Sequence, residues 1–377
     1  MPAHIREGKP HRVFPAGEYA SLRAMNDLHV NHDSHPPRDD QASPIMVEVT
    51  RGDIVESQHR GRAAVVDREG AVILSWGDIE ASVYPRSAIK PLQAIPLIES
   101  GAADACGATD TEIAVGCASH GGEHMHVETI TAWLARCGLS VTDLECGSHT
   151  PSHGPSSDDL VRQDAAFHAA HNNCSGKHAA MLVTAKHLGD PTAGYIDYTH
   201  PVQQRVLGVL EQMCGLDLAS APRGVDGCSI PTIAAPLGNL ALAFARFADP
   251  GDEVPTRRAD AIRRIHAALA AAPEMIAGTG RYCSDVIRAT EGKVLVKTGA
   301  EGVFCGAVPA LGLGIALKCE DGAKRASEAM MTAILMRIGA IDEVTLQSID
   351  QALPQPILNR NLRVVGEVRT TAVLRAE

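Results

Sequence analysis

The hydrophobic pattern of this chain changes its period twice, and that change limits the folds that the chain can adopt. Between about residue 126 and residue 272, apolar side chains recur three and four positions apart, as they do in amphipathic helices. A closing helix is predicted over residues 324–340. Six segments near the two ends of the chain instead have the length and composition of strands: residues 46–52, 63–67, 71–77, 293–299, 302–308 and 312–319.

Strands at both ends with helices between them indicate one antiparallel sheet that is built from both ends of the chain. The predicted fold class is therefore α/β, of the α+β kind, with a helical region between the two groups of strands. We expect residues 46–377 to form one folded domain. Residues 1–45 contain five histidines and no apolar periodicity, so they are expected to be a disordered N-terminal extension.

The composition argues against several classes of function. The formal net charge of −11 would repel nucleic acid. No apolar run approaches the ~20 residues that a membrane-spanning helix needs, and the N-terminus has no signal-peptide pattern. These features predict a cytoplasmic protein, in which the ten cysteines stay reduced.

A first candidate for chemistry is Ser87, which precedes Lys90 by three positions in a helix predicted over residues 87–99. Pro91 falls in the first turn of this helix, where proline is tolerated, and Pro96 predicts a kink. Side chains at positions i and i+3 share one face of a helix. A serine hydroxyl needs a base to take its proton before it attacks a carbonyl carbon, and a desolvated, neutral lysine can serve. Ser-x-x-Lys is frequent by chance, so an N-cap serine beside a solvated lysine is the alternative for this motif alone.

A second candidate is Lys297, which begins the sequence Lys-Thr-Gly at the end of a predicted strand. An early Ser-x-x-Lys and a late Lys-Thr-Gly occur together in penicillin-recognising serine enzymes. The order of strands and helices predicted here puts both motifs in corresponding places. Together they favour a serine enzyme that transfers acyl groups, whereas Lys297 alone could equally be a surface lysine at a strand end.

Two further segments combine small residues with reactive ones. The loop at residues 117–123, Cys-Ala-Ser-His-Gly-Gly-Glu, has glycines that let a backbone approach a ligand closely. Cys174 and Lys177 precede Cys228 by about fifty residues. This spacing is not a zinc-finger pattern, so spacing alone favours two buried structural cysteines over a cation site.

Taken together, five motifs resemble one family, the rhizobial-type, thermolabile L-asparaginases, also called the asparaginase II family. In chain order the motifs are YPRSAIKP, GCASHGGE, NNCSGKHAAM, GVDGCSIP and LVKTGAEGVFC. The resemblance covers roughly residues 46–376 and leaves the first 45 residues outside. It implies a fold like that of serine β-lactamases and glutaminases, and a homodimer.

The resemblance also implies an active site with two serine–lysine pairs. These pairs correspond to Ser87 with Lys90 and to Ser119 with Lys297. Residues of the matching motifs that we expect to contact substrate are Arg86, His120, Gly121 and Glu301.

A zinc ion beside the active site is the cofactor that the resemblance implies. Two cysteines and a lysine would bind it, and they correspond to Cys174, Cys228 and Lys177. Asp226 corresponds to an acidic residue next to that site. A lysine binds metal only after it loses its proton, so such binding would weaken at low pH.

The function that the resemblance implies is hydrolysis of a small molecule, L-asparagine, to L-aspartate and ammonia. Ser87 is expected to be the nucleophile with Lys90 as its base, and Ser119 with Lys297 to relay protons; the two serines could exchange these roles. Zinc is expected either to position the substrate or to shape the pocket. The alternatives are a glutaminase or other β-lactamase-like hydrolase, and a non-catalytic, zinc-stabilised binding protein.

Overall fold

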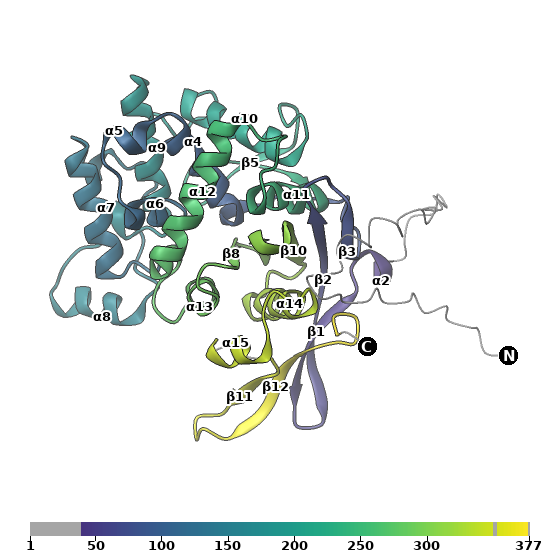
Figure 1. The fold of residues 1–377 in the computed structure, drawn as a ribbon. Coiled ribbons are helices and arrows are strands. Elements are labelled where there is room, and N and C mark those ends of the chain that lie inside the picture. The colour runs from purple at the N-terminus through teal and green to yellow at the C-terminus, as the bar shows by residue number, and fades with distance from the viewer. Residues whose placement is uncertain (1–38, 350–352, 376–377) are drawn as a thin grey trace.

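An antiparallel sheet lies beside a larger group of helices in the computed structural model, which describes residues 39–349 and 353–375 (Figure 1). The helices come from the middle of the chain, and the sheet takes strands from both ends. The predicted α/β class, with a helical region between two groups of strands, is confirmed. Within those two ranges, no helix has the length and apolar content to cross a membrane.

The sheet of the described residues contains eight strands, and every pair in it is antiparallel. Its order is β11-β12-β1-β2-β10-β9-β8, with β3 beside β2. The strands are β1 (Ile45–Arg51), β2 (Ile54–Asp67), β3 (Val72–Trp76), β8 (Leu295–Thr298), β9 (Val303–Val308), β10 (Leu313–Cys319), β11 (Gln355–Leu358) and β12 (Val364–Thr370).

Strand β2 joins the two ends of the chain. Its first half pairs with β1, and its second half pairs with β10, where Gly61 opposes Cys319 and Asp67 opposes Leu313. Beyond β10 and β9, the strand β8 forms the edge of the sheet and contacts the helical region. Lys297 near the end of β8 therefore lies where sheet and helices meet.

Helices cover both faces of the central strands. A Cβ atom on Gly314 of β10 would lie 2.0 Å from the Ala245 nitrogen in α11 (Leu237–Ala248), so α11 rests directly on the strand. Gly306 opposes Ile315, the next residue along β10, and so points to the other face, where Met331 of α14 (Lys324–Arg337) lies. Burial on both faces explains the continuous apolar runs of β9 and β10.

The helical region packs around α9 (Ser175–Leu188). Every residue of α9 from 175 to 185 is buried. The helices in contact with it are α4 (Ile95–Glu99), α5 (Ala102–Ala105), α6 (Asp110–Gly116), α7 (His124–Arg136) and α10 (Pro201–Cys214). Outside this group are α8 (Gly154–Arg162), α12 (Thr256–Ala271), α13 (Tyr282–Ala289) and α15 (Glu343–Ser348).

The predicted helix over residues 87–99 is divided in the structure. A 3-10 turn at Arg86–Ile89 leads into α3 (Lys90–Gln93), and α4 follows. The break before α4 agrees with the kink predicted at Pro96, whereas the separate 3-10 turn before Pro91 was not predicted. Each proline lacks the N–H that a continuous helix would use.

The ends of the chain also differ from the predictions. Strands β11 and β12 form an edge hairpin that was not predicted, and their mixture of exposed and buried residues gives a weak pattern. The described structure begins before the predicted boundary at residue 45, with α2 (Asp39–Ala42), and the Pro44 oxygen accepts the N–H of Gly61 at 3.0 Å. Residues 1–38 lie outside the described residues, so disorder there stays a prediction.

A glycine allows α9 to touch α6. A Cβ atom on Gly176 would lie 2.0 Å from the Val115 carbonyl oxygen, so the two backbones could not keep their places around a larger residue. Gly208 in α10 is different, because it is exposed and nothing lies within 4 Å of a Cβ atom built there.

Gly176→Ala should lower the free energy of unfolding by at least ~2 kcal/mol, because the helices would have to separate. Gly208→Ala is the matched control and should raise it by about 0.5–1 kcal/mol, because alanine is the better helix former. Urea titrations followed by circular dichroism would measure both changes. If Gly176→Ala and Gly208→Ala changed the free energy of unfolding equally, this account of the α6–α9 contact would be contradicted.

Candidate active site

Ser119 lies in the loop between α6 and α7, and backbone hydrogen bonds hold this loop on two sides. Its N–H donates to the carbonyl oxygen of Ile276 at 2.9 Å. The N–H of His120 donates to the carbonyl oxygen of Asn173 at 3.2 Å. Ser119 is therefore fixed between the segment that precedes α9 and the segment that precedes α13.

The Ser119 hydroxyl lies between two lysine amines. Lys297 Nζ is 2.8 Å from Ser119 Oγ, and Lys90 Nζ is 3.0 Å from it. Lys90 is fully buried, and Lys297 is 1% exposed. Lys90 also donates to the carbonyl oxygens of Ala118 and Asn173. A hydroxyl within hydrogen-bond reach of a buried amine is the geometry of a nucleophile with its base.

The two amines differ in their electrostatic surroundings. Burial lowers the pKa of Lys297 to about 7, and the positive charge of Lys90 adds to this effect. Burial also lowers the pKa of Lys90, but the negative charge of Cys174, whose Sγ is 3.2 Å away, opposes the shift. Lys297 is therefore the amine that can be neutral near pH 7 and accept a proton.

Ser87 does not pair with Lys90 as the sequence suggested. It is partly exposed in the 3-10 turn, and its hydroxyl makes no hydrogen bond within the described residues. Lys90 donates to Ser119 instead. The turn does touch the Lys-Thr-Gly segment, because a Cβ atom on Gly299 would lie 2.9 Å from the Pro85 oxygen. The two motifs are thus adjacent, and it is Ser119 that both lysines reach.

Cys174, Lys177 and Cys228 come together in a buried cluster next to Lys90. Lys177 Nζ is 3.0 Å from Cys228 Sγ, and the Cys228 thiol donates to the Cys174 sulfur. That hydrogen bond, followed by the charges of Lys90 and Lys177, holds the pKa of Cys174 well below its ordinary value. The same hydrogen bond raises the pKa of Cys228. Negative charge is therefore favoured on Cys174 over Cys228.

These three groups fit a zinc site by their chemistry. Two sulfurs and a nitrogen are donors that Zn²⁺ prefers, and all three side chains converge from α9 and the loop after β5 (Arg223–Val225). Burial lowers the pKa of Lys177, but the charges of Cys174 and Cys228 outweigh it, so the net shift is upward. Lys177 would therefore have to release a proton before it could bind the metal.

Arg86 connects the 3-10 turn to the loop that carries Cys228. Its Nε and Nη2 atoms lie 3.1 and 2.9 Å from Asp226 Oδ1, which also accepts the N–H of Gly227. The hydrogen bond to Asp226 raises the pKa of Arg86, and the nearby charge of Glu301 adds to this. Arg86 has a φ of 50°, a left-handed conformation that costs energy for a non-glycine residue.

His120 and Gly121 serve the loop itself rather than an open site. The His120 Nδ1 accepts the N–H of Gly122, so Nε2 carries the hydrogen and donates to Ser175 Oγ at 2.9 Å. Burial holds the pKa of His120 well below its ordinary value, in agreement with a neutral ring. The N–H of Gly121 donates to the Ala277 oxygen at 2.9 Å and is not free to bind substrate.

Several groups at the site had no signal in the sequence. The carbonyl oxygens of Ala118, Asn173 and Ile276 hold Lys90 and Ser119, and every residue has such an oxygen.

A second cluster of possible metal ligands, His59, Cys319 and Asp321, was also not anticipated. Its groups already bond to one another, with His59 Nδ1 2.6 Å from Asp321 Oδ2 and Cys319 Sγ 3.0 Å from Asp321 Oδ1.

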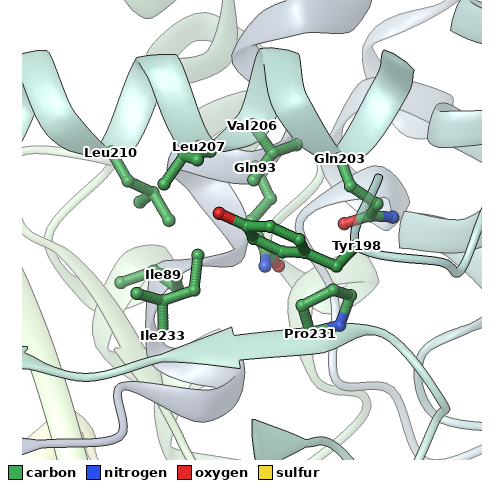
Figure 2. A pocket seen from close by; sticks show the side chains of 9 residues that line it. All are labelled: Ile89, Gln93, Tyr198, Gln203, Val206, Leu207, Leu210, Pro231 and Ile233. Atoms are coloured by element: carbon green, nitrogen blue, oxygen red, sulfur yellow. The ribbon is translucent and has the colours of Figure 1, made fainter. Parts of the chain in front are cut away.

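A small pocket adjoins the 3-10 turn through Ile89 (Figure 2). Tyr198 crosses it between α10 and β6 (Pro231–Ile233), and Arg223 stacks on the Tyr198 ring with Cζ 4.1 Å from its centroid. The other residues that line it are Gln93, Gln203, Val206, Leu207, Leu210, Pro231 and Ile233. Of these described residues none is a candidate nucleophile, base or metal ligand, so the chemistry lies elsewhere.

The profile of the L-asparaginase II family matches residues 47–370, which is most of the chain. The chain belongs to the L-asparaginase II family. This membership makes it an amidohydrolase. No protein among the curated proteins matches its sequence.

Solved structures show a distant similarity to this member of the L-asparaginase II family. A β-lactamase from Mycobacterium bovis has 12% identity and a TM-score of 0.40, and the match covers 77% of this chain and 95% of that one. The D-alanine carboxypeptidase AmpC from Burkholderia cenocepacia has 12% identity and a TM-score of 0.38, over 74% of this chain and 93% of that one. Similarities at this level say nothing about substrate.

In this L-asparaginase II family protein, Lys297→Met should raise the free energy of unfolding, because it removes an amine whose protonation burial opposes. The unfolded chain keeps the ordinary lysine pKa of about 10.4. Between that pH and about 7, the unfolded state holds a proton that the folded state lacks, so wild-type stability rises with pH there. The advantage of the variant should be greatest below pH 7 and should shrink toward pH 10.

Urea titrations at pH 6.5 and pH 9 would measure this difference. Lys293→Met is the matched control, because Lys293 is exposed and, among the described residues, pairs only with Glu291. If the free energy of unfolding of Lys297→Met, relative to wild type, increased with pH, a lowered pKa for this amine would be contradicted.

Proposed function

We propose that this chain is an L-asparagine amidohydrolase in which Ser119 attacks the side-chain amide of the substrate. The observation that carries the proposal is the Ser119 hydroxyl between two buried lysine amines, in a protein of the L-asparaginase II family. This exchanges the roles first expected for the two serines. Ser87, partly exposed beside the Lys-Thr-Gly segment, becomes a supporting hydroxyl.

The proposed reaction has two halves. In the first, neutral Lys297 takes the Ser119 proton while Ser119 Oγ bonds to the amide carbon of asparagine. The carbon–nitrogen bond then breaks, the proton passes from Lys297 to the leaving nitrogen, and ammonia departs from an aspartyl ester of Ser119. In the second half, water gives a proton to Lys297, attacks the ester and releases aspartate, and the proton returns to Ser119 Oγ.

Lys90 has a different role in this proposal. Its amine lies 3.0 Å from Ser119 Oγ and 3.2 Å from Cys174 Sγ, so the neighbouring thiolate favours its protonated form. A cation at this distance stabilises the oxyanion character that develops on Ser119 as its proton leaves. Lys90 thus acts through charge, and Lys297 acts through proton transfer.

Zinc is part of the proposal as a supporting cofactor. Cys174, Cys228 and Lys177 would hold it, and Asp226 lies beside them, bonded to Arg86. When bound, zinc would supply a fixed positive charge next to the substrate. The homodimer and the cytoplasmic location also belong to the proposal. The family resemblance supports the homodimer, and the sequence pattern at the N-terminus supports the location.

Wild-type protein should release ammonia from L-asparagine faster than from L-glutamine, and it should not hydrolyse a cephalosporin. Ser119→Ala should lower kcat for asparagine by at least roughly 10³-fold, because nucleophile and proton acceptor then no longer act together. Ser87→Ala should lower it by no more than roughly 10²-fold. Faster release from glutamine would favour the glutaminase alternative, and a larger loss in Ser87→Ala than in Ser119→Ala would restore Ser87 as the nucleophile.

Protein purified without chelator should hold about one zinc per chain, measured by elemental analysis. Cys174→Ser and Cys228→Ser should lose it, whereas Cys106→Ser should keep it, because Cys106 is no part of the cluster. Occupancy should fall between pH 7.5 and pH 5.5, because Lys177 must be deprotonated to bind. Full zinc occupancy in both cysteine variants would show that Cys174 and Cys228 do not bind the metal. Chelated protein as inactive as Ser119→Ala would contradict a supporting role.

A further inference from the structure

The segments before and after Arg281 are both hydrogen-bonded to the candidate active site. On one side, Ser119 and Gly121 donate their N–H groups to Ile276 and Ala277, so the segment that leads to Arg281 runs beside the Ser119 loop. On the other side, Arg281 is followed by α13, and Cys283 in its first turn accepts the N–H of Thr298 at 3.4 Å. Thr298 is the neighbour of Lys297, so the backbone on both sides of Arg281 is hydrogen-bonded to segments that carry Ser119 or Lys297.

The backbone before Arg281 is itself fixed by a buried carboxylate. Glu123, 9% exposed, accepts the N–H and the hydroxyl of Thr279, both at 2.8 Å. Gly278 has a φ of 122°, and a Cβ atom there would lie 2.2 Å from Glu123 Oε1. The approach to Arg281 is therefore rigid, as a group that positions a ligand requires.

The guanidinium of Arg281 makes no hydrogen bond or ion pair within the described part of the chain, although its charge acts on the buried carboxyl group of Glu328. Arg281 is half-buried. Other arginines nearby are paired: Arg86 bonds to Asp226, and Arg288, on the same helix, bonds to Glu274 and Asp285. An arginine has five N–H donors, and burial without an acceptor is costly. An unpaired guanidinium beside a reactive serine is suited to an anionic group of the substrate.

The electrostatic effects of Arg281 agree with this placement. Burial and the charge of Lys90 are the main causes that lower the pKa of Lys297, and the positive charge of Arg281 lowers it further. The charge of Arg281 also lowers the pKa of His120, where burial is the largest cause and other charged groups have larger effects than Arg281. The charge of Arg281 therefore acts on the same space that the lysines and the Ser119 loop enclose.

In asparagine, two carbon atoms, the α-carbon and the β-methylene, separate the negatively charged α-carboxylate from the reacting amide carbon. With that carbon at Ser119 Oγ, the α-carboxylate has to lie within a few ångströms of the site. Lys90 and Lys297 already bond to Ser119, and Arg86 already bonds to Asp226. A planar guanidinium matches a carboxylate with two parallel hydrogen bonds, which gives direction as well as charge.

We propose that Arg281 binds the α-carboxylate of the substrate and thereby selects amino-acid amides over simple amides. This inference rests on the proposed function, because it assumes that the Ser119 site accepts asparagine. It assigns a specificity-determining role to a residue that lies outside the motifs of the two serine–lysine pairs.

The test compares L-asparagine with 3-aminopropanamide, which has the same amide and amine but no α-carboxylate. Arg281→Gln should lower kcat/KM for asparagine by roughly 10²-fold and leave kcat/KM for 3-aminopropanamide within about threefold of wild type. For Arg281→Lys, kcat/KM for asparagine should lie between the values of wild type and Arg281→Gln, because lysine keeps the positive charge but cannot make two parallel hydrogen bonds to a carboxylate. Arg288→Gln, on the same helix, should leave the ratio of the two substrates unchanged. An equal loss on both substrates in Arg281→Gln would overturn the proposal.

Failure of the proposed function would look different, because wild-type protein would then release no ammonia from asparagine. In that case calorimetry with L-aspartate and β-alanine decides the role of Arg281. Weaker binding of L-aspartate to Arg281→Gln than to wild type, without a change for β-alanine, supports the carboxylate site. Unchanged binding of L-aspartate overturns it.

Discussion

The constraint on which the rest of this protein depends is a continuous chain of hydrogen bonds through three buried lysines. It runs through Lys297, Ser119, Lys90, Cys174, Cys228 and Lys177, in that order. Burial opposes positive charge on every amine, and two sulfurs within this chain can compensate it. Lys90 and Lys177 each touch one of those sulfurs. Within the described chain, Lys297 donates only to a hydroxyl and to its neighbour's carbonyl oxygen, and burial lowers its pKa to about 7. The order of groups along the chain therefore decides which amine becomes the base.

The fold holds these groups with backbone from distant parts of the sequence. The strands that carry Lys297 to the site come from the C-terminal half, but they are paired through β10 to β2, near the other end. The thiolate side of the chain comes from α9, which only a glycine at position 176 allows to approach α6. Neither end of the polypeptide alone could form the site. A single sheet from both ends is what brings the base to the serine.

The sequence was enough to predict the helices and strands, but not which of their side chains contact one another in the folded protein. Strand periodicity at both ends predicted the sheet, and the Ser-x-x-Lys and Lys-Thr-Gly motifs are adjacent as expected. Local spacing then suggested that Ser87 would meet Lys90, because positions i and i+3 share a helix face. Pro91 and Pro96 break that helix, and Lys90 reaches 29 residues along the chain to Ser119. Likewise, the unpaired state of Arg281 depends on which carboxylates lie near it in space, and no sequence pattern reports that.

The central claim is that Ser119, between Lys90 and Lys297, forms the covalent bond to substrate. The most direct measurement is to mix the protein with L-asparagine, quench in acid during turnover, and map the aspartyl ester by mass spectrometry of proteolytic peptides. The account predicts the ester on the peptide that contains Ser119 and none on the peptide that contains Ser87. An ester on Ser87 would contradict it.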